Sequence, residues 1–206
     1  MKKFFALMMV SLLTASTTYA HFYIGGEVGL SMLKSRERTT IPPEQHDLGG
    51  FGCVGGGFFG YNFGHKFDCG IEGFIVGDSA RNTVLHHQNN SKLSVKNRYI
   101  WGARVLPGYR FFKKVEAHLV AGYARGYFKL HDSGAYGTVS KNFCTNGYQV
   151  GAGLTITASK CIDVRVDEIY TGYASKSMKG VGSTGATIYS IKPYTFDSTV
   201  AVIFKF

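Results

Sequence analysis

Histidine is the first residue type to consider for chemistry, because its imidazole side chain exchanges a proton near neutral pH. The sequence has seven histidines, among them the adjacent pair His86-His87 in a polar segment and His118 between apolar residues. A hydrolytic enzyme would also need a nucleophile or an acid at a matching position. We see no such constellation beside the pair, which we interpret as solvated, and we interpret His118 as a hydrogen-bonding residue. We therefore predict no enzyme activity and no catalytic residue.

The four cysteines are the second candidates for chemistry: Cys53, Cys69, Cys144 and Cys161. None of them lies in a CxxC pair or at a cysteine–histidine spacing typical of zinc ligands. We therefore expect no metal site and no cofactor. If the chain is exported, these thiols reach an oxidising compartment where disulfides can form. Their number does not determine a pairing, so the disulfide state stays open.

Charged residues recur at alternate positions within stretches that are otherwise apolar. Alternate side chains of a β-strand share one face, and buried charges are stable only when they are paired and hydrogen-bonded. We therefore predict that these residues line the inside of a closed sheet as a salt-bridge network. In the alternative interpretation, individual charges lie solvated at the ends of the strands. The predicted network comprises Glu27, Glu72, Arg104, Glu116, His118, Arg165 and Asp167.

The elements that would position these charges are strands, identified by a period of two in hydrophobicity. In residues 148–157, for example, large apolar side chains alternate with Gln, Gly and Thr. Residues 48–64 are uncharged, so a transmembrane helix is the alternative there, but each of their glycines costs about 1 kcal/mol in a helix. The eight predicted strands are residues 22–32, 49–63, 67–75, 99–111, 117–123, 148–157, 162–167 and 196–206.

The connections between these strands alternate strictly between long and short. Long polar segments occupy residues 34–47, 78–96, 129–146 and 172–194, whereas short turns fall at 64–66, 113–114 and 159–161. In an up-and-down barrel, connections of one kind gather at one end. The sequence therefore predicts an all-β fold, a single eight-stranded antiparallel up-and-down transmembrane β-barrel. Both chain ends would share one end with the short turns, and four surface loops would lie at the other.

The large apolar side chains are expected to face outward, into a membrane. Eight strands enclose only enough space for packed side chains, and the sixteen or more large apolar side chains of the predicted strands would overfill it. In lipid, a closed barrel also satisfies every backbone hydrogen-bonding group. Aromatic residues near the strand ends are then expected to form interfacial girdles, including Tyr61, Phe63, Tyr109, Phe111 and Tyr123.

The N-terminus is typical of a secretory signal peptide. Lys2 and Lys3 precede an apolar run at residues 4–13 and a small residue, Ala20, at the expected cleavage site. The apolar run is too short for the alternative, a membrane anchor. Cleavage after Ala20 would leave residues 21–206 as one barrel domain with a net charge of +8. In an exported chain this charge favours lipopolysaccharide or host polyanions as partners over nucleic acid.

By these features the chain resembles the small outer-membrane β-barrel family that includes OmpA-like transmembrane domains, OmpX-like proteins and opacity porins. The resemblance spans residues 21–206, and two segments, 57–63 and 106–111, look like family strands approaching a periplasmic turn. The four cysteines depart from the family pattern. The resemblance implies location in the bacterial outer membrane, reached through the periplasm. It also implies a C-terminal signal for the barrel-assembly machinery, formed by Val200, Val202, Phe204 and Phe206.

The function that the resemblance favours is structural, adhesive or host-interacting, and is carried by the surface loops. The second loop contains four basic residues, Arg81, Lys92, Lys96 and Arg98. Their positive charge favours contact with outer-membrane lipid, lipopolysaccharide or host surface molecules. A narrow porin-like channel with a charged lumen is the alternative. A lipid A-modifying envelope enzyme is less favoured. Fold alone does not decide among these functions.

Overall fold

The computed structural model describes residues 20–39, 45–86, 91–134, 137–182 and 185–206. Among these residues, no helix is long and apolar enough to cross a membrane. The predicted signal peptide lies outside the described residues, and cleavage after Ala20 stays a prediction. The described strands are β1 (His21–Thr39), β2 (Gln45–Gly64), β3 (Phe67–Asp78), β4 (Arg81–His86), β5 (Ser91–Phe112), β6 (Val115–Gly134), β7 (Gly137–Thr157), β8 (Ile162–Tyr173), β9 (Lys176–Gly182) and β10 (Gly185–Lys205).

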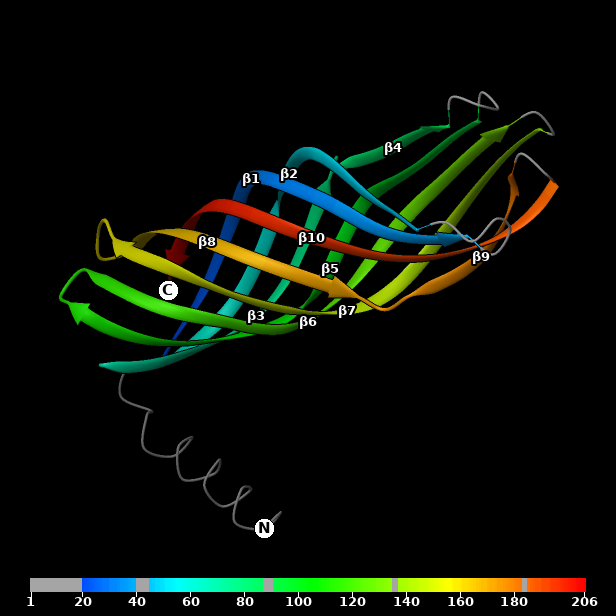
Figure 1. Ribbon diagram of the computed structural model, residues 1–206. Helices are drawn as coiled ribbons and strands as arrows, with labels where there is room; N and C mark the ends of the chain where they lie inside the picture. Colours follow the sequence, from blue (N-terminus) through cyan, green and yellow to red (C-terminus); the bar gives the residue numbers. More distant parts are fainter. Residues whose placement is uncertain (1–19, 40–44, 87–90, 135–136, 183–184) are drawn as a thin grey trace, which may run out of the picture.

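Eight of these strands form a closed antiparallel ring. The hydrogen-bonded order is β1-β2-β3-β5-β6-β7-β8-β10, and pairing of β1 with β10 closes the ring. The short strands β4 and β9 pair with β5 and β10, respectively, and follow β3 and β8 after brief interruptions. The predicted eight-stranded up-and-down barrel is therefore confirmed. The three short turns and the C-terminus lie at one end, which we call the turn end, and β4 and β9 mark the opposite, hairpin end (Figure 1).

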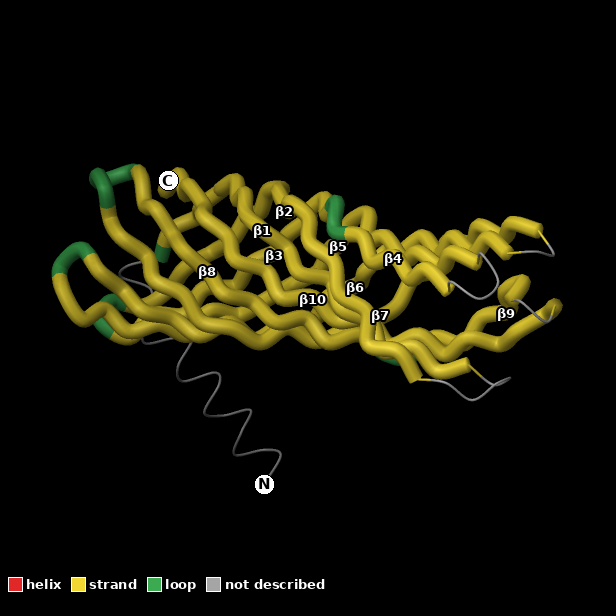
Figure 2. Tube along the Cα trace, turned by 45° about the horizontal axis from the view of Figure 1, so that its top comes forward, coloured by secondary structure: helices red, strands yellow, loops and turns green. Residues whose placement is uncertain are grey.

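The prediction of four long loops was wrong for most of their residues, which continue the strands as hairpins. On one side, β4, β5, β6 and β7 stay paired up to Lys92↔Ser133 and Gly134↔Gly137. On the other side, β9, β10, β1 and β2 stay paired up to Thr39↔Tyr189. Figure 2 shows these two groups of strands at the hairpin end. Their polar composition suggested loops, but in a hairpin outside lipid the exposed face can be polar.

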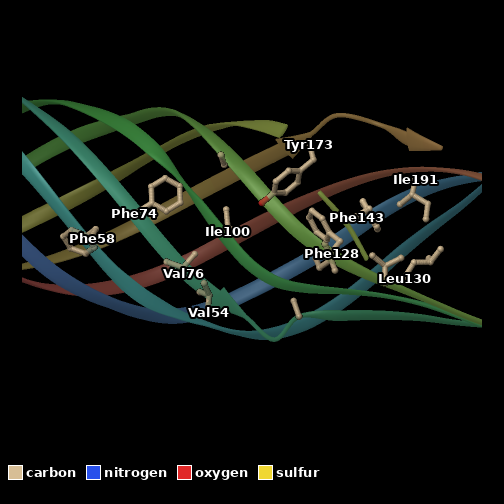
Figure 3. Close-up of a cluster of buried hydrophobic side chains, with 14 of the residues drawn as sticks. Val54, Phe58, Phe74, Val76, Ile100, Phe128, Leu130, Phe143, Tyr173 and Ile191 are labelled. Carbon is tan, nitrogen blue, oxygen red and sulfur yellow. The ribbon is translucent and has the colours of Figure 1, made fainter. Parts of the chain in front are cut away.

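Apolar side chains from both groups of strands meet in one buried cluster that begins inside the barrel. Figure 3 shows Phe58, Phe74 and Ile100 in the barrel and Leu130 and Ile191 beyond it. Further members of this apolar cluster are Leu33, Val54, Val76, Leu93, Val95, Phe128, Phe143 and Tyr173. Because each hairpin buries one apolar face against the other group, the extensions have a core of their own.

The barrel wall has a large apolar exterior bounded by two aromatic bands. Exposed outward residues include Phe22, Val28, Phe59, Leu119 and Val200. Near the turn end, ring contacts join Phe22 to Tyr61 and Phe67 to Tyr109, and near the hairpin end they join Tyr99 to Tyr127 and Tyr148 to Tyr170. Tyr109 also contacts Phe111, and Tyr123 is exposed. Such bands are typical of the two interfaces of a membrane.

The turn between β2 and β3 depends on glycine. Gly64 has φ +124°, a conformation that residues with a Cβ rarely adopt. A Cβ at this position would also lie 2.3 Å from the carbonyl oxygen of Phe67. Gly64 therefore allows β2 to reverse into β3 within two residues.

Candidate functional site

The centre of the barrel contains a compact group of ionisable side chains, which we call the lumen charge cluster: Glu27, Glu72, Arg104, His118, Arg165 and Asp167. They come from β1, β3, β5, β6 and β8 and point inward because they share the inward parity of their strands. All six are nearly inaccessible, with exposed fractions of 1 to 4%. Six of the seven residues predicted for the network are thus brought together.

Glu72 is shared by both arginines. Arg104 Nε donates to Glu72 Oε1, and Arg165 Nη1 donates to Oε2 at 2.8 Å. The Tyr23 hydroxyl also donates to Glu72 Oε2, at 3.2 Å. Because this carboxylate accepts charge-assisted hydrogen bonds from two guanidinium groups, it joins the two halves of the cluster.

Each arginine also has a carboxylate of its own. Arg104 Nη2 lies 3.0 Å from Glu27 Oε2, and Arg165 Nε lies 2.8 Å from Asp167 Oδ2. The other oxygen of Asp167 lies 2.8 Å from His118 Nε2. His118 is thus held by a buried acid. Two guanidinium groups and the imidazole therefore face three carboxylates in a small volume.

Aromatic rings and backbone close the space around the lumen charge cluster. The Arg165 guanidinium lies 4.4 Å from the ring centroid of Phe58, and that of Arg104 lies 5.0 Å from the ring centroid of Phe74. A Cβ on Gly153 would lie 2.0 Å from Asp167 Oδ1, so only glycine leaves room for the acid there. The apolar cluster continues toward the hairpin end, as Figure 3 shows. Between the lumen charge cluster and the hairpin end the lumen is therefore filled by packed side chains, whereas a small pocket lined by Arg110, Glu116 and His118 lies toward the turn end.

Glu116, the seventh predicted residue, lies apart from this cluster. It is part-buried near the turn end and accepts a 3.2 Å hydrogen bond from Arg110 Nη2, which also lies 3.6 Å from Asp68 Oδ2. The Arg110 side chain is 37% exposed. This placement agrees with the alternative of a partly solvated charge at a barrel end. Arg110 stands on the same inward-facing parity of β5 as Arg104. This alternation was a sequence signal for adding Arg110 to the predicted network.

A second buried polar layer, which the sequence did not single out, lies between β1, β3, β5 and β10. Asp78 accepts hydrogen bonds from Ser31 Oγ at 3.0 Å and from Asn97 Nδ2 at 2.7 Å. Asp197 lies opposite Ser31 and accepts a bond from Thr195 Oγ1 at 3.2 Å. Asp78 and Asp197 stand close to segment ends in the sequence, where a buried charge is hard to distinguish from a solvated one.

The predicted basic loop is a two-stranded hairpin. Arg81 and Lys96 lie directly opposite each other on β4 and β5, and both are exposed, as are Lys92 and Arg98. Arg81 Nε donates to Ser94 Oγ at 2.7 Å, which holds the guanidinium along the hairpin. Placing these residues in a loop was wrong, because alternate residues Leu93 and Val95 are buried in the apolar cluster and keep the segment extended.

More exposed basic side chains surround the hairpin end than were predicted. They are Lys34, Arg36, Arg125, Lys141, Lys176, Lys179 and Lys192. Among the described side chains of residues 33–52, 81–98, 128–146 and 174–194, the single carboxylate is Asp132, which is buried. We call these seven basic residues together with Arg81, Lys92, Lys96 and Arg98 the basic rim. Arg98 and Arg125 lie beside Tyr99 and Tyr127 of the outer aromatic band, and most of the rim lies on the parts of the strands that extend beyond this band.

The remaining predicted sites are located as follows. Val200, Val202, Phe204 and Phe206 all point outward and are exposed, and the Phe206 backbone N–H donates to Phe22 O at 3.0 Å. The four cysteines are free thiols. Among the described residues no group of histidine, cysteine, aspartate and glutamate is arranged to hold a metal ion. His87 lies outside the described residues, as does the side chain of His86.

Comparisons with known proteins agree with this architecture. A family model described as outer membrane protein beta-barrel domain matches residues 4–204. Neisserial surface protein A is 13% identical, with 91% of this chain and 99% of that chain covered and a TM-score of 0.49. The outer membrane protease OmpT from Escherichia coli is 9% identical, with coverages of 93% and 98% and a TM-score of 0.53. A major outer membrane protein from Thermus thermophilus is 12% identical, with coverages of 91% and 100% and a TM-score of 0.52. No significant match is found among curated protein sequences.

Proposed function

The chain belongs to the outer membrane protein β-barrel family and lies in the bacterial outer membrane, and from this premise we propose that it is a structural and interaction barrel whose basic rim binds polyanions. The turn end then faces the periplasm and the hairpin end faces outward. The polyanions nearest to such a rim are lipopolysaccharide of the same membrane and acidic host surface molecules. Nucleic acid is not a proposed partner.

The basic rim is the observation that supports this function. Arg81 and Lys96 are like charges placed opposite each other, an arrangement that destabilises an isolated strand pair. An anion bound between them would remove this repulsion. The rim also adds the charges of neighbouring strands, and clustered charges of one sign raise the local concentration of a counter-charged ligand.

A variant in which glutamine replaces Arg81, Lys92, Lys96 and Arg98 is expected to bind heparin and lipopolysaccharide about tenfold more weakly. Each exposed charge contributes a few tenths of a kcal/mol to binding, and a total of about 1.4 kcal/mol corresponds to a tenfold change in affinity. Binding of the parent protein should fall as salt is added, since exposed charges are screened. Retention on immobilised heparin and the dissociation constant for lipopolysaccharide, each measured at several salt concentrations, would test both effects.

The matched control carries the same four-charge change at the opposite end. Lys66, Lys113, Lys114 and Lys160 are exposed at the three periplasmic turns, and their replacement by glutamine is expected to leave both affinities unchanged. Equal weakening by both quadruple variants would indicate a response to net charge alone and would contradict the proposed rim.

We propose binding rather than catalysis, and a closed barrel rather than a channel. Inside the barrel, His118 and Asp167 are 4% and 1% exposed, and the pocket that His118 lines there has a volume of about 60 Å³, too small for a lipid or peptide substrate. The same packing opposes the channel alternative, because water and ions need a continuous polar path. No observation on the described residues favours either activity over binding.

The refolded protein is expected to give no steady conductance steps in a planar bilayer, because Phe58 and Phe74 cover the arginines of the lumen charge cluster. Recordings would use protein whose closed form has been checked by its shifted migration on an unboiled denaturing gel. Reproducible unit steps from that preparation would restore the channel hypothesis.

We also propose that the outward residues of the last strand, Val200, Val202, Phe204 and Phe206, address the chain to the barrel-assembly machinery. They form an exposed alternating row that ends at the periplasmic side. The machinery would meet this row before β10 pairs with β1.

A further inference from the structure

A carboxylate stands on the lipid-facing wall of the barrel. Glu168 is exposed on the outward side of β8, with Val166 and Tyr170 as its outward neighbours along the strand. Ionisable groups that face lipid are costly and are functional candidates by default. Ser198 Oγ donates to Glu168 Oε2 at 2.7 Å and is its one hydrogen-bond partner among the described residues. The carboxylate therefore keeps acceptor capacity on the membrane side.

Glu168 lies at one end of an apolar groove of about 620 Å³ across the outward faces of β5, β6, β7 and β8. Ala117, Ala152 and Gly153 line the groove, so small side chains leave a hollow in the wall. Tyr109 and Leu154 also contribute to its lining. The groove reaches from the periplasmic aromatic band to Glu168, two residues before Tyr170 of the outer band. It therefore offers an apolar surface to an acyl chain.

A cation lies at the outer band on β6, six residues along the strand from the row in which Leu119, Ala152 and Glu168 face one another. Arg125 is exposed on β6, on the same outward parity as Leu119, which lines the groove. Its strand neighbours are Trp101 on β5 and Asn146 on β7. From the periplasmic side outward, the wall therefore presents an apolar groove, a hydrogen-bond acceptor and a positive charge.

We propose that this wall binds one molecule of lipid A, the lipid anchor of lipopolysaccharide. An acyl chain lies in the groove, a hydroxyl or amide N–H near the top of that chain donates to Glu168, and a headgroup phosphate binds Arg125. A glycerophospholipid of the inner leaflet could fill the groove, but it offers no hydroxyl or amide donor at the depth of Glu168. The inference deepens the proposed function, since it assigns the lipid part of lipopolysaccharide to a site separate from Arg81, Lys92, Lys96 and Arg98.

The test is native mass spectrometry of the refolded full-length barrel in detergent, with lipid A or phosphatidylglycerol added as the probe. The parent protein should retain one lipid A in preference to phosphatidylglycerol. Glu168→Leu removes the acceptor, and Ala152→Phe fills the groove. Each substitution is expected to lower lipid A retention about tenfold. A tenfold loss corresponds to about 1.4 kcal/mol, which is the magnitude expected when a hydrogen bond to a charged group or an acyl-chain contact is lost.

Two controls separate the site from general effects. Val28→Phe adds a ring of the same kind on β1, outside the groove lining, and should retain lipid A as the parent does. Glu168→Gln keeps a carbonyl acceptor and should retain more lipid A than Glu168→Leu. Each variant is first shown to be closed by its migration on an unboiled denaturing gel, and Ala152→Leu replaces Ala152→Phe if the latter fails this check.

Three results would overturn the inference: unchanged lipid A retention in Glu168→Leu and Ala152→Phe, equal retention of phosphatidylglycerol, or a protein dimer that Ala152→Phe dissociates. The last result would assign the groove to a second copy of the chain. The proposed function fails differently, because it is measured by heparin binding of the quadruple rim variant, which leaves the groove intact.

Discussion

Arg165→Met is expected to lower the free energy of unfolding by about 3 to 5 kcal/mol, the range found when one partner of a buried ion pair is removed. Arg165 donates to both oxygens of Glu72 and lies 2.8 Å from Asp167. Without its guanidinium, three buried carboxylates would face Arg104 and His118. Methionine keeps much of the side-chain volume over Phe58, so the loss reports mainly charge. Urea unfolding in detergent micelles, followed by tryptophan fluorescence, would measure it.

Arg110→Met is the matched control for this change. Arg110 also contacts two acids, but its side chain is 37% exposed, and Asp68 keeps a hydrogen bond from Asn62 Nδ2 at 3.3 Å when Arg110 is removed. The cost expected there is smaller than for Arg165, because a part-exposed ion pair contributes less than a fully buried one. Equal costs for the two arginines would mean that burial of the lumen charge cluster contributes nothing.

A double variant separates the charge imbalance from the lost contacts. Glu72→Gln removes one negative charge, and in the Arg165→Met background it leaves two carboxylates for Arg104 and His118. The double variant should therefore be less destabilised than the sum of the two single variants, with an interaction free energy of about 1 to 3 kcal/mol. Simple additivity would contradict the idea that Glu72 joins both arginines electrostatically.

Alternation along the strands was sufficient to predict the barrel and the inward side of its charges. Arg104 and Arg165 each stand on the parity opposite to large outward side chains, and closure of the ring brings them together through Glu72. The distances could not be predicted, because they depend on the stagger around the ring. This stagger places Glu72 beside Arg104 but Glu116 at the periplasmic end.

The extent of the strands was underestimated for a physical reason. Outside the membrane the exposed face of a strand becomes polar, so residues 91–98 lose the high hydrophobicity that marks residues 99–111. The period of two persists, however, since Leu93 and Val95 are buried and Lys92 and Lys96 are exposed. Glu168 was missed for the opposite reason: it is a charge on the outward parity, where an apolar residue is expected.

The second large effect is expected for Phe128→Ala, which should lower the free energy of unfolding by about 3 to 5 kcal/mol. Phe128 is fully buried, and its ring centroid lies 5.3 Å from that of Phe143 and 5.0 Å from that of Tyr173. Alanine would leave a cavity in the apolar cluster beside Phe143 and Tyr173, because neighbouring strands cannot close a space of ring size. The same unfolding experiment would measure the change.

Phe59→Ala is its control, because Phe59 is 69% exposed on the outer wall and its removal leaves no cavity, only a change in contact with lipid or detergent. The smaller loss expected there distinguishes packing from simple removal of a ring.

The position of Phe128 near the hairpin end gives a second readout. If the extensions share one core, trypsin cleavage after Lys92 of β5 and after Lys179 of β9 should increase together in Phe128→Ala. Cleavage confined to one of the two sites would show that the hairpins are held independently, and the basic rim would then lack the fixed spacing that joint packing provides.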